Sequence, residues 1–390
     1  MHLAHLSLTN VRTFRRLEID LQRGVHLIAG ANAQGKSNLL EAVQMLATAR
    51  TLRSGTDLDL ISWGAVDEDP LPAARLDATV ETAGGKRTLE IAVIAAETVA
   101  GARPTRASRR FRVNGVARRA SDLIGQLRVV MFSADDLEIV SGAPAMRRRY
   151  LDITISQFDP AYLRALQRYS RVLEQRNSLL RKLAERRGQA DELDFWDDEL
   201  AAAGALIVQR RADAVHVLAR DARERYAELA PDESEDLAIC YQPRLPGGLE
   251  AAVREHDLQE RFRAALVPER REDIRRGVTR WGPHRDDLEF RIGGHPAAVS
   301  ASRGQQRTAA LALRLAEVDL SRGRTGDPPV LLLDDILSEL DAHRRERILG
   351  AAYHVDQVLI TTPDEDRPSE VELPGAIRYR LEAGVLTPRP

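Results

Sequence analysis

The stretch G-A-N-A-Q-G-K-S at residues 30–37 decides the fold, because it follows the mainly apolar run Val25–Ala29 and leads into apolar residues at helical spacing between Lys36 and Thr48. A glycine, four residues and then Gly-Lys-Ser, placed between a strand and a helix, is the pattern of a phosphate-binding loop, or P-loop. Its glycines let the backbone wrap around phosphates, and its N–H groups and the helix N-terminus supply partial positive charge. We therefore predict an ATP site formed by Gly30, Ala31, Asn32, Ala33, Gln34, Gly35, Lys36, Ser37 and Asn38.

A second motif supplies the carboxylates that such a site requires. The apolar run V-L-L-L-D-D at residues 330–335 predicts a buried strand that ends in two aspartates. Lys36 is expected to reach the β- and γ-phosphates, and the Ser37 hydroxyl and Asp334 to hold Mg²⁺. Asp335 is expected to orient or deprotonate the attacking water. The predicted catalytic residues are therefore Lys36, Asp334 and Asp335.

The amino-acid composition is that of a folded protein with nearly balanced charge. The chain has 390 residues, 43% hydrophobic, 30% charged and a net charge of −2, which excludes a disordered chain and a disulfide-stapled miniprotein. Its single cysteine, Cys240, forms no internal disulfide and is expected to be a buried apolar residue. No apolar run approaches the ~18 residues of a membrane span, and the N-terminus has no secretory pattern, so we expect a cytoplasmic protein without a membrane partner.

The pattern along the chain predicts an α/β fold with a helical insertion. Alternating segments predict strands at 5–8 and 17–21 and an antiparallel meander at 75–81, 88–94 and 110–113, with a hairpin turn at Gly84-Gly85. Residues 150–230 have few Pro or Gly and predict two or three long helices, with a turn at 188–191. Strands at 288–292, 330–335 and 357–360 alternate with helices at 305–320 and 343–353, which favours a mixed sheet flanked by helices. The predicted domains are 1–120, 121–275 and 276–390.

Two further segments narrow the class of ATPase. S-R-G-Q-Q at 302–306 opens a predicted helix, and S-E-L-D at 338–341 follows the acidic strand. In this order they resemble the signature motif and D-loop of ABC-type ATPases. That resemblance implies that Ser302, Gly304 and Gln305 contact ATP held by a second copy of the chain, and that Ser338 and Asp341 form the D-loop. One P-loop and one signature per chain then require a head-to-tail homodimer around two ATP molecules.

Motifs throughout the chain resemble those of the RecF family of bacterial recombination and gap-repair proteins. They are L-T-N-V-R-T-F at 8–14, G-A-N-A-Q-G-K-S-N-L-L-E-A at 30–42, F-S-A-D-D-L at 132–137, R-R-R-Y-L-D at 147–152, G-P-H-R-D-D at 282–287, S-R-G-Q-Q-R at 302–307 and L-L-L-D-D-I-L-S-E-L-D at 331–341. The resemblance implies an ABC-type P-loop ATPase head built from both chain ends, with an inserted helical second domain. Two departures are Ala134, where proline is common, and Thr361-Thr362, where many ABC ATPases have a histidine.

The same resemblance implies what the protein does. It implies an ATP-bound homodimer on double-stranded and gapped DNA that acts with RecR and RecO in loading RecA at single-strand gaps. Hydrolysis is expected to be weak, stimulated by DNA, and to reset the dimer.

Local basic residues are the candidates for DNA contact, since the net charge gives no overall attraction. Residues 103–119 contain no Asp or Glu and hold Arg103, Arg106, Arg109, Arg110, Arg112, Arg118 and Arg119, and residues 147–149 add a second cluster. Such patches suit contacts to backbone phosphates. They also fit a solvated loop in a chain whose 57 basic residues include only three lysines. The segment G-P-H-R-D-D has two interpretations as well: a structural turn, or a catalytic role for His284.

Three other functions use a P-loop. A transporter-type ABC subunit would act through a membrane or protein partner, but the helical insertion and the arginine-rich loops disfavour it. An SMC-like structural ATPase needs heptads over a much longer chain. A small-molecule kinase needs neither S-R-G-Q nor S-E-L-D.

Overall fold

The computed structural model describes residues 1–51, 56–68, 71–96, 104–231, 234–245, 255–337, 340–352, 354–363, 373 and 375–389. The chain divides into two compact units, which are described separately. The head unit comprises Met1–Asp136, Glu228–Ala230 and Glu317–Pro390, and the helical unit comprises Leu137–Ala227 and Pro231–Ala316. The domain borders expected after residues 120 and 275 stay a prediction.

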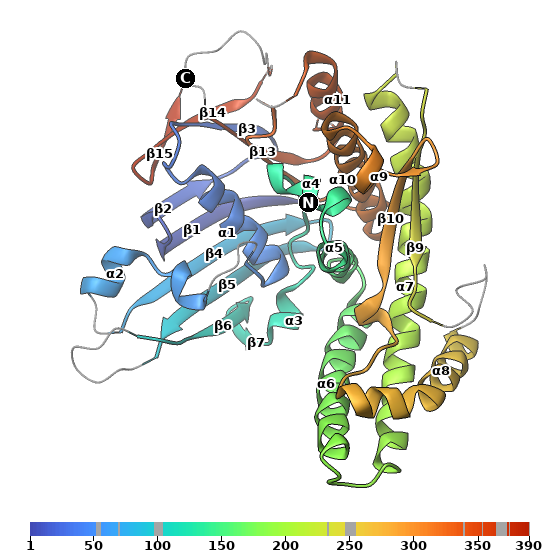
Figure 1. Ribbon diagram of the computed structural model, residues 1–390. Coiled ribbons are helices and arrows are strands. Elements are labelled where there is room, and N and C mark those ends of the chain that lie inside the picture. The colour runs from blue at the N-terminus through green and yellow to red at the C-terminus, as the bar shows by residue number, and fades with distance from the viewer. Residues whose placement is uncertain are drawn as a thin grey trace. The chain divides into compact units, whose positions relative to one another are not determined.

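The first sheet of the head unit is antiparallel throughout its described strands (Figure 1). Its order is β2-β1-β4-β5-β6-β7, formed by β1 (His2–Val11), β2 (Phe14–Asp20), β4 (Ala73–Thr82), β5 (Gly85–Ala95), β6 (Ala107–Val113) and β7 (Val116–Arg118). Alternating burial along β4 and β5 shows one face in the core and one in solvent, as the sequence alternation predicts. The predicted meander and its turn before Gly85 are confirmed.

The second sheet of the head unit is mixed, as predicted. Its order is β15-β14-β3-β13-β12-β8, formed by β3 (Gly24–Ala29), β8 (Val129–Phe132), β12 (Val330–Asp334), β13 (Gln357–Thr362), β14 (Ile377–Glu382) and β15 (Val385–Arg389). All neighbours pair in parallel except β14 and β15. The unbroken apolar run of β12 is fully buried at residues 330–333, which is typical of a central parallel strand covered on both faces.

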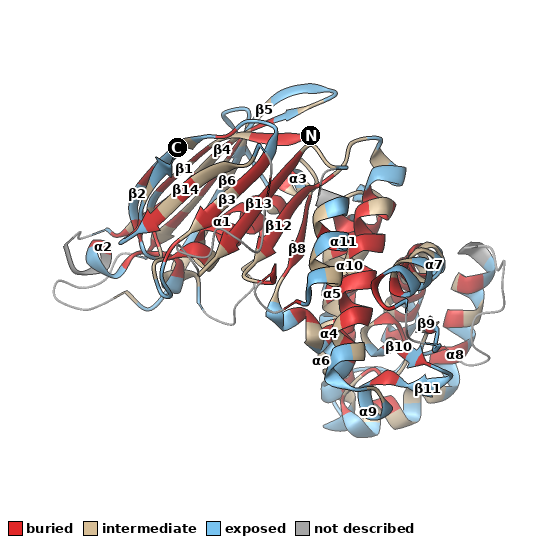
Figure 2. Cartoon of the chain, turned by 90° about the horizontal axis from the view of Figure 1, so that it is seen from above, coloured by how far each residue is buried: buried red, intermediate tan, exposed pale blue. Residues whose placement is uncertain are grey.

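Helix α1 (Lys36–Thr48) lies in the core of the head unit and packs against strands of both sheets. It buries nearly all of its residues, Ser37 and Asn38 apart. Apolar side chains from the first sheet, α1 and the second sheet form one continuous core, visible as buried strands in Figure 2. Truncating a side chain such as Leu40, which is fully buried, would cost about 2–5 kcal/mol. This core therefore fixes the start of α1, where the P-loop ends.

The helical unit contains the long helices that the sequence predicts. They are α6 (Pro160–Ala184), most of α7 (Glu192–Leu229) and the first part of α10 (Arg303–Thr325). Two further helices, α5 (Pro144–Ser156) and α8 (Glu255–Arg276), also belong to this unit, and the sequence analysis did not predict α8. Asp159 caps α6, because its side chain accepts hydrogen bonds from the backbone N–H groups of Ala161 and Tyr162. A small antiparallel sheet has the order β11-β10-β9, from β9 (Leu237–Gln242), β10 (Asp287–Ile292) and β11 (His295–Pro296).

Short elements complete the described chain. They are η1 (Asp57–Leu60), α2 (Trp63–Glu68), α3 (Ala120–Leu123), η2 (Ala134–Asp136), α4 (Leu137–Ser141), η3 (Pro283–Arg285), α9 (Ala297–Ser300) and α11 (Ala342–Ala352). No helix within the described ranges has both the length and the apolarity needed to cross a membrane.

One expectation about the fold is wrong: Cys240 is exposed rather than buried. It occupies an outward position on β9, where burial alternates and the neighbouring Ile239 faces the core. A single small residue carries no periodic signal of its own, so its face is set by the residues around it.

Candidate nucleotide site

The P-loop closely approaches two neighbouring segments of the head unit. Gly35 has a φ of 105°, and a side chain added there would place Cβ 2.5 Å from Thr13 Oγ1. A Cβ on Gly30 would collide with the carbonyl oxygen of Leu381. Both glycines are therefore required by sterics, and Gly35 also by a left-handed backbone conformation that other residues rarely adopt.

The side chain of Lys36 points back toward the backbone of the P-loop. Its Nζ donates hydrogen bonds to the carbonyl oxygens of Gly30 (2.6 Å) and Ala31 (2.9 Å). Burial lowers the pKa of Lys36, while the charges of Asp335 and Asp334 act in the opposite direction. The ammonium group is thus held by the loop backbone, near both aspartates.

Three elements bring a hydroxyl, a carboxylate and a second hydroxyl together. Ser37, at the start of α1, donates a hydrogen bond to Asp334 Oδ1 over 3.0 Å. Thr361, on β13, donates to the same oxygen over 2.8 Å. The parallel register places Asp334 opposite Thr361. The start of α1 and the end of β12 thus bring together Ser37 and Asp334, the two residues expected to hold a cation, and β13 adds Thr361 beside them.

Asp335 follows in a strained position. Its φ of 53° lies in the left-handed region, and its backbone N–H donates to Thr361 Oγ1 over 3.1 Å. Such a conformation costs about 1–3 kcal/mol and persists only where neighbouring structure imposes it. Thr361 therefore contacts both aspartates. The sequence marked this position only as a departure from the histidine of many ABC ATPases, and it did not reveal these contacts.

Other loop residues are fixed by segments distant in sequence. Gln34 Oε1 accepts a hydrogen bond from the backbone N–H of Ala383 over 2.5 Å. Asn38 Nδ2 donates to Thr13 Oγ1 over 3.2 Å. Ala31, Asn32 and Ala33 are exposed, and Ala33 has a φ of 67°. The turn between β14 and β15 and the turn between β1 and β2 therefore brace the loop.

The signature segment belongs to the helical unit, and its residues cap α10. Ser302 Oγ accepts a hydrogen bond from the Gln305 N–H (3.2 Å), and Gln305 Oε1 accepts one from the Ser302 N–H (3.0 Å). This reciprocal pair is a capping box. Ser302 and Gly304 are exposed.

The D-loop residues fall partly outside the described residues, since Ser338 is not among them. Asp341 caps α11, and its Oδ1 accepts a hydrogen bond from the Arg344 N–H over 2.9 Å. These hydrogen bonds and the charge of Arg344 lower the pKa of Asp341.

Comparisons with known proteins agree with this geometry. The family described as "RecF/RecN/SMC N terminal domain" matches residues 2–378. The DNA replication and repair protein RecF of Herpetosiphon aurantiacus is 45% identical over the full length of both chains, and that of Halalkalibacterium halodurans is 35% identical over 99% of each. The chain belongs to the RecF family.

Solved structures support the same assignment. One, described as the recombination mediator protein RecF-ATP in the RecFOR pathway, is 30% identical, with a TM-score of 0.87 over 100% of this chain and 97% of that one. An Smc head domain of Pyrococcus furiosus is 16% identical with a TM-score of 0.53, which shows a shared fold. The predicted RecF membership and ABC-type α/β head fold are therefore confirmed.

The arginines predicted for DNA in this RecF-family chain differ in their surroundings. Arg109 pairs with Asp57 and donates to the carbonyl of Ala49, and Arg112 lies 3.4 Å from Glu90. Arg103 lies outside the described residues. The exposed members on β6, β7 and their flanks are Arg106, Arg110, Arg112, Arg118 and Arg119, and of these Arg112 is the one placed beside Glu90. Arg147 is buried and donates to both oxygens of Asp287, at 2.7 and 3.0 Å, so it is not part of a surface patch.

The segment G-P-H-R-D-D forms a buried polar network in the helical unit. Asp286 is 1% exposed and accepts hydrogen bonds from Arg211, Tyr241 and the Arg244 N–H. Burial raises the pKa of Asp286, while Arg211 opposes that effect. His284 contacts Tyr169 and a backbone carbonyl within its own unit. These contacts favour the structural interpretation of the segment.

Proposed function

We propose that this RecF-family chain is an ATPase of recombinational DNA repair whose P-loop site binds ATP. The observation that carries the proposal is the convergence of Ser37, Asp334 and Thr361 beside Lys36. P-loop ATPases hold phosphates with a loop lysine, and they hold the associated metal ion with a hydroxyl and a carboxylate. The RecF structures described with ATP and with an ATP analogue support the same ligand.

The donor set fits Mg²⁺. Ser37 Oγ and Asp334 Oδ1 lie 3.0 Å apart, and the hard oxygen ligands that they offer are those this ion prefers when it keeps several waters. When bound, the ion would neutralise charge on the β- and γ-phosphates.

Lys36 must change partners when ATP binds. Its Nζ is held by two neutral carbonyls, and a phosphate oxygen offers a charged acceptor that forms a stronger hydrogen bond. We therefore infer that the γ-phosphate draws Lys36 away from the loop carbonyls. Asp335 then orients the attacking water, from a backbone position that Thr361 holds.

Hydrolysis is proposed to require a second copy of the chain. Ser302, Gly304 and Gln305 lie at the N-terminus of α10, where N–H groups favour a phosphate. In a head-to-tail dimer this helix end would cap ATP bound by the partner subunit, with Ser338 and Asp341 beside it. Loss of the γ-phosphate would then weaken the dimer, and weak DNA-stimulated turnover would reset it.

DNA and the recombination mediators are the proposed partners. Arg106, Arg110, Arg118 and Arg119 are the exposed arginines we assign to backbone phosphates of double-stranded or gapped DNA. The relatives' names and the RecFOR description support RecR and RecO as partners in loading RecA. An ABC subunit that powers a membrane partner is not favoured by these comparisons.

Fluorescence anisotropy of a labelled gapped duplex tests the proposal. The protein is titrated with ATP and Mg²⁺ or with ADP and Mg²⁺, at two salt concentrations. We expect tighter binding with ATP that weakens steeply with salt, since phosphate contacts release counterions. Arg110→Gln/Arg118→Gln should lower the salt slope, whereas Arg168→Gln, at an exposed arginine paired with Glu199, should leave it unchanged. Equal binding in ATP and ADP would refute ATP-gated DNA binding.

A further inference from the structure

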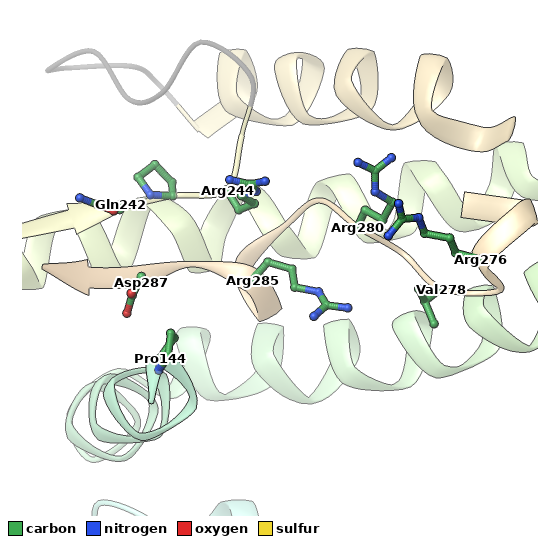
Figure 3. Close-up of a pocket in the computed structure, with 9 residues that line it drawn as sticks. Pro144, Gln242, Arg244, Arg276, Val278, Arg280, Arg285 and Asp287 are labelled. Carbon is green, nitrogen blue, oxygen red and sulfur yellow. The ribbon is translucent and has the colours of Figure 1, made fainter. Parts of the chain in front are cut away.

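The helical unit contains an open cavity of about 620 Å³ that no step of the proposed function uses. Its lining includes Arg244, Arg276, Arg280, Arg285 and Asp287. The lining residues come from the start of α5, the end of β9 and the segment after it, the end of α8, the segment that follows α8, η3 and β10 (Figure 3). The volume lies within the range of about 300–1,000 Å³ that holds small ligands.

The lining is strongly basic. It includes four arginines, which Figure 3 shows distributed along the cavity, and one carboxylate. That carboxylate, Asp287, is already engaged by the guanidinium group of Arg147 at 2.7 and 3.0 Å. Asp287 therefore does little to offset the charge of the arginines.

The four arginines are compensated unequally. Arg276 pairs with Glu272 at 2.5 Å, and Arg280 pairs with Glu269 at 2.8 Å. Arg244 has its guanidinium carbon 5.0 Å from the centre of the Trp281 ring, which orients the side chain without neutralising it. Within the described residues, neither Arg244 nor Arg285 forms an ion pair with a carboxylate. Two guanidinium groups thus remain uncompensated at one cavity.

We propose that this cavity binds phosphoryl groups, presented either by free pyrophosphate-like anions or by the backbone of a nucleic acid strand. Guanidinium groups form paired, charge-assisted hydrogen bonds with phosphate oxygens. Two uncompensated cations suit a ligand that carries two negative charges better than they suit a ligand that carries one carboxylate. Arg244 and Arg285 are the residues that would contact the phosphates. The site is separate from the P-loop and does not depend on ATP binding there.

Calorimetric titration with pyrophosphate tests the site. All variants are made in a Lys36→Ala background, so that the contribution of the P-loop is small and is the same in every protein compared. We expect binding that weakens by about tenfold or more in Arg244→Gln/Arg285→Gln, because each lost charged hydrogen bond weakens binding by that order. The matched control is Arg168→Gln/Arg220→Gln, two exposed arginines of the same unit paired with Glu199 and Asp221. Unchanged melting temperatures would show that both double variants are folded.

An oligonucleotide without terminal phosphates forms the second arm and identifies the source of the phosphates. Weaker pyrophosphate binding alone in the cavity variant would support free anions as the ligand. Weaker oligonucleotide binding, with or without an effect on pyrophosphate, would support a nucleic acid strand. If cavity variant and control bind both probes equally, or if neither probe binds the Lys36→Ala protein, the proposal is overturned.

Discussion

Ser37 and Asp334 are 297 positions apart in the sequence, yet the Ser37 hydroxyl donates a hydrogen bond to Asp334 Oδ1 over 3.0 Å. The contact joins the first turn of α1 to the end of β12, and thus the two ends of the chain that form the head unit. Because both elements are anchored in one apolar core, the pair is set by packing rather than by its own attraction. Rigid placement of this kind is what a phosphate site requires.

Lys36→Ala should weaken ATP binding by about 10- to 100-fold, because it removes a charged donor to the phosphates. A fluorescent ATP analogue and equilibrium titration would measure the change. Lys86→Ala is the control, since Lys86 is an exposed lysine on β5. Equal affinities of the Lys36→Ala and Lys86→Ala proteins would remove the P-loop from nucleotide binding.

Thr361→Val should reduce kcat for ATP hydrolysis by about tenfold or more while leaving KM nearly unchanged. The substitution keeps the shape of the side chain but removes the hydroxyl that contacts both Asp334 and the Asp335 N–H. One charge-assisted hydrogen bond is worth about 1.5–3 kcal/mol. Steady-state ATPase assays in the presence of DNA would measure both constants. Thr361→Ser retains the hydroxyl and should restore most of the rate; a serine variant as slow as the valine one would argue against this positioning role.

The P-loop and its helix were predictable because their signals are local. The pattern of Gly30, Gly35, Lys36 and Ser37 and the apolar spacing of residues 39–46 predict the strand, the loop and the span of α1. The long helices of residues 150–230 follow from composition in the same way. Local patterns therefore recovered the elements that carry the candidate site.

Several other features were not predictable, because they depend on distant partners. Helix α8 has a polar sequence with Pro268 in its interior, so neither its periodicity nor its composition suggests a helix. Thr361 is brought to two aspartates only by the strand register. The cavity arginines come from segments separated by more than thirty residues, and only their folded positions distinguish Arg244 and Arg285 from an arginine-rich surface.

Ser302→Ala should leave nucleotide binding by the monomer unchanged but should abolish ATP-dependent dimerisation. Ser302 is exposed at the start of α10, and it is proposed to contact only the ATP of the partner subunit. Light scattering with and without ATP would measure the dimer, and equilibrium titration would measure binding. Loss of monomer binding in Ser302→Ala would contradict a site shared between subunits.

Asp335→Asn should instead stabilise the ATP-bound dimer, since the activation of the attacking water is lost.

Arg176→Ala should destabilise the helical unit by about 3–5 kcal/mol. Arg176 is fully buried and pairs with Asp197 at 2.7 Å and with Asp273 at 2.8 Å, both of which are also fully buried. Removing the cation leaves Asp273 without its guanidinium partner in a low-dielectric interior, while Asp197 keeps its contact with Arg270 at 2.7 Å. Urea unfolding would measure the loss. Arg168→Ala, at an exposed ion pair with Glu199, should change stability by less than about 1 kcal/mol, and equal losses in the two variants would be inconsistent with this account.

His284 should make the stability of the helical unit depend on pH. Its Nε2 lies 3.0 Å from the Thr279 carbonyl and must donate, so its Nδ1 accepts a hydrogen bond from the Tyr169 hydroxyl at 2.7 Å. Burial lowers the pKa of His284 from 6.5 to about 4, and the nearby charges of Arg285, Arg148 and Arg176 act in the same direction. The neutral ring is therefore the form that the folded state prefers.

The unfolded chain binds a proton at His284 at higher pH than the folded chain does, so its contribution to stability is complete above pH 6.5. It should decline as the pH falls from 6.5 toward 4, by up to about 3 kcal/mol. Urea midpoints measured across this range for the native protein and for His284→Gln would isolate the contribution of His284 to stability, because all other titratable groups are present in both proteins. The native curve should fall more steeply than the variant curve. A lower pKa in the folded state means that protonation of His284 in the unfolded chain reduces the free energy of unfolding. Parallel curves would show instead that His284 has the same pKa in the folded and unfolded states.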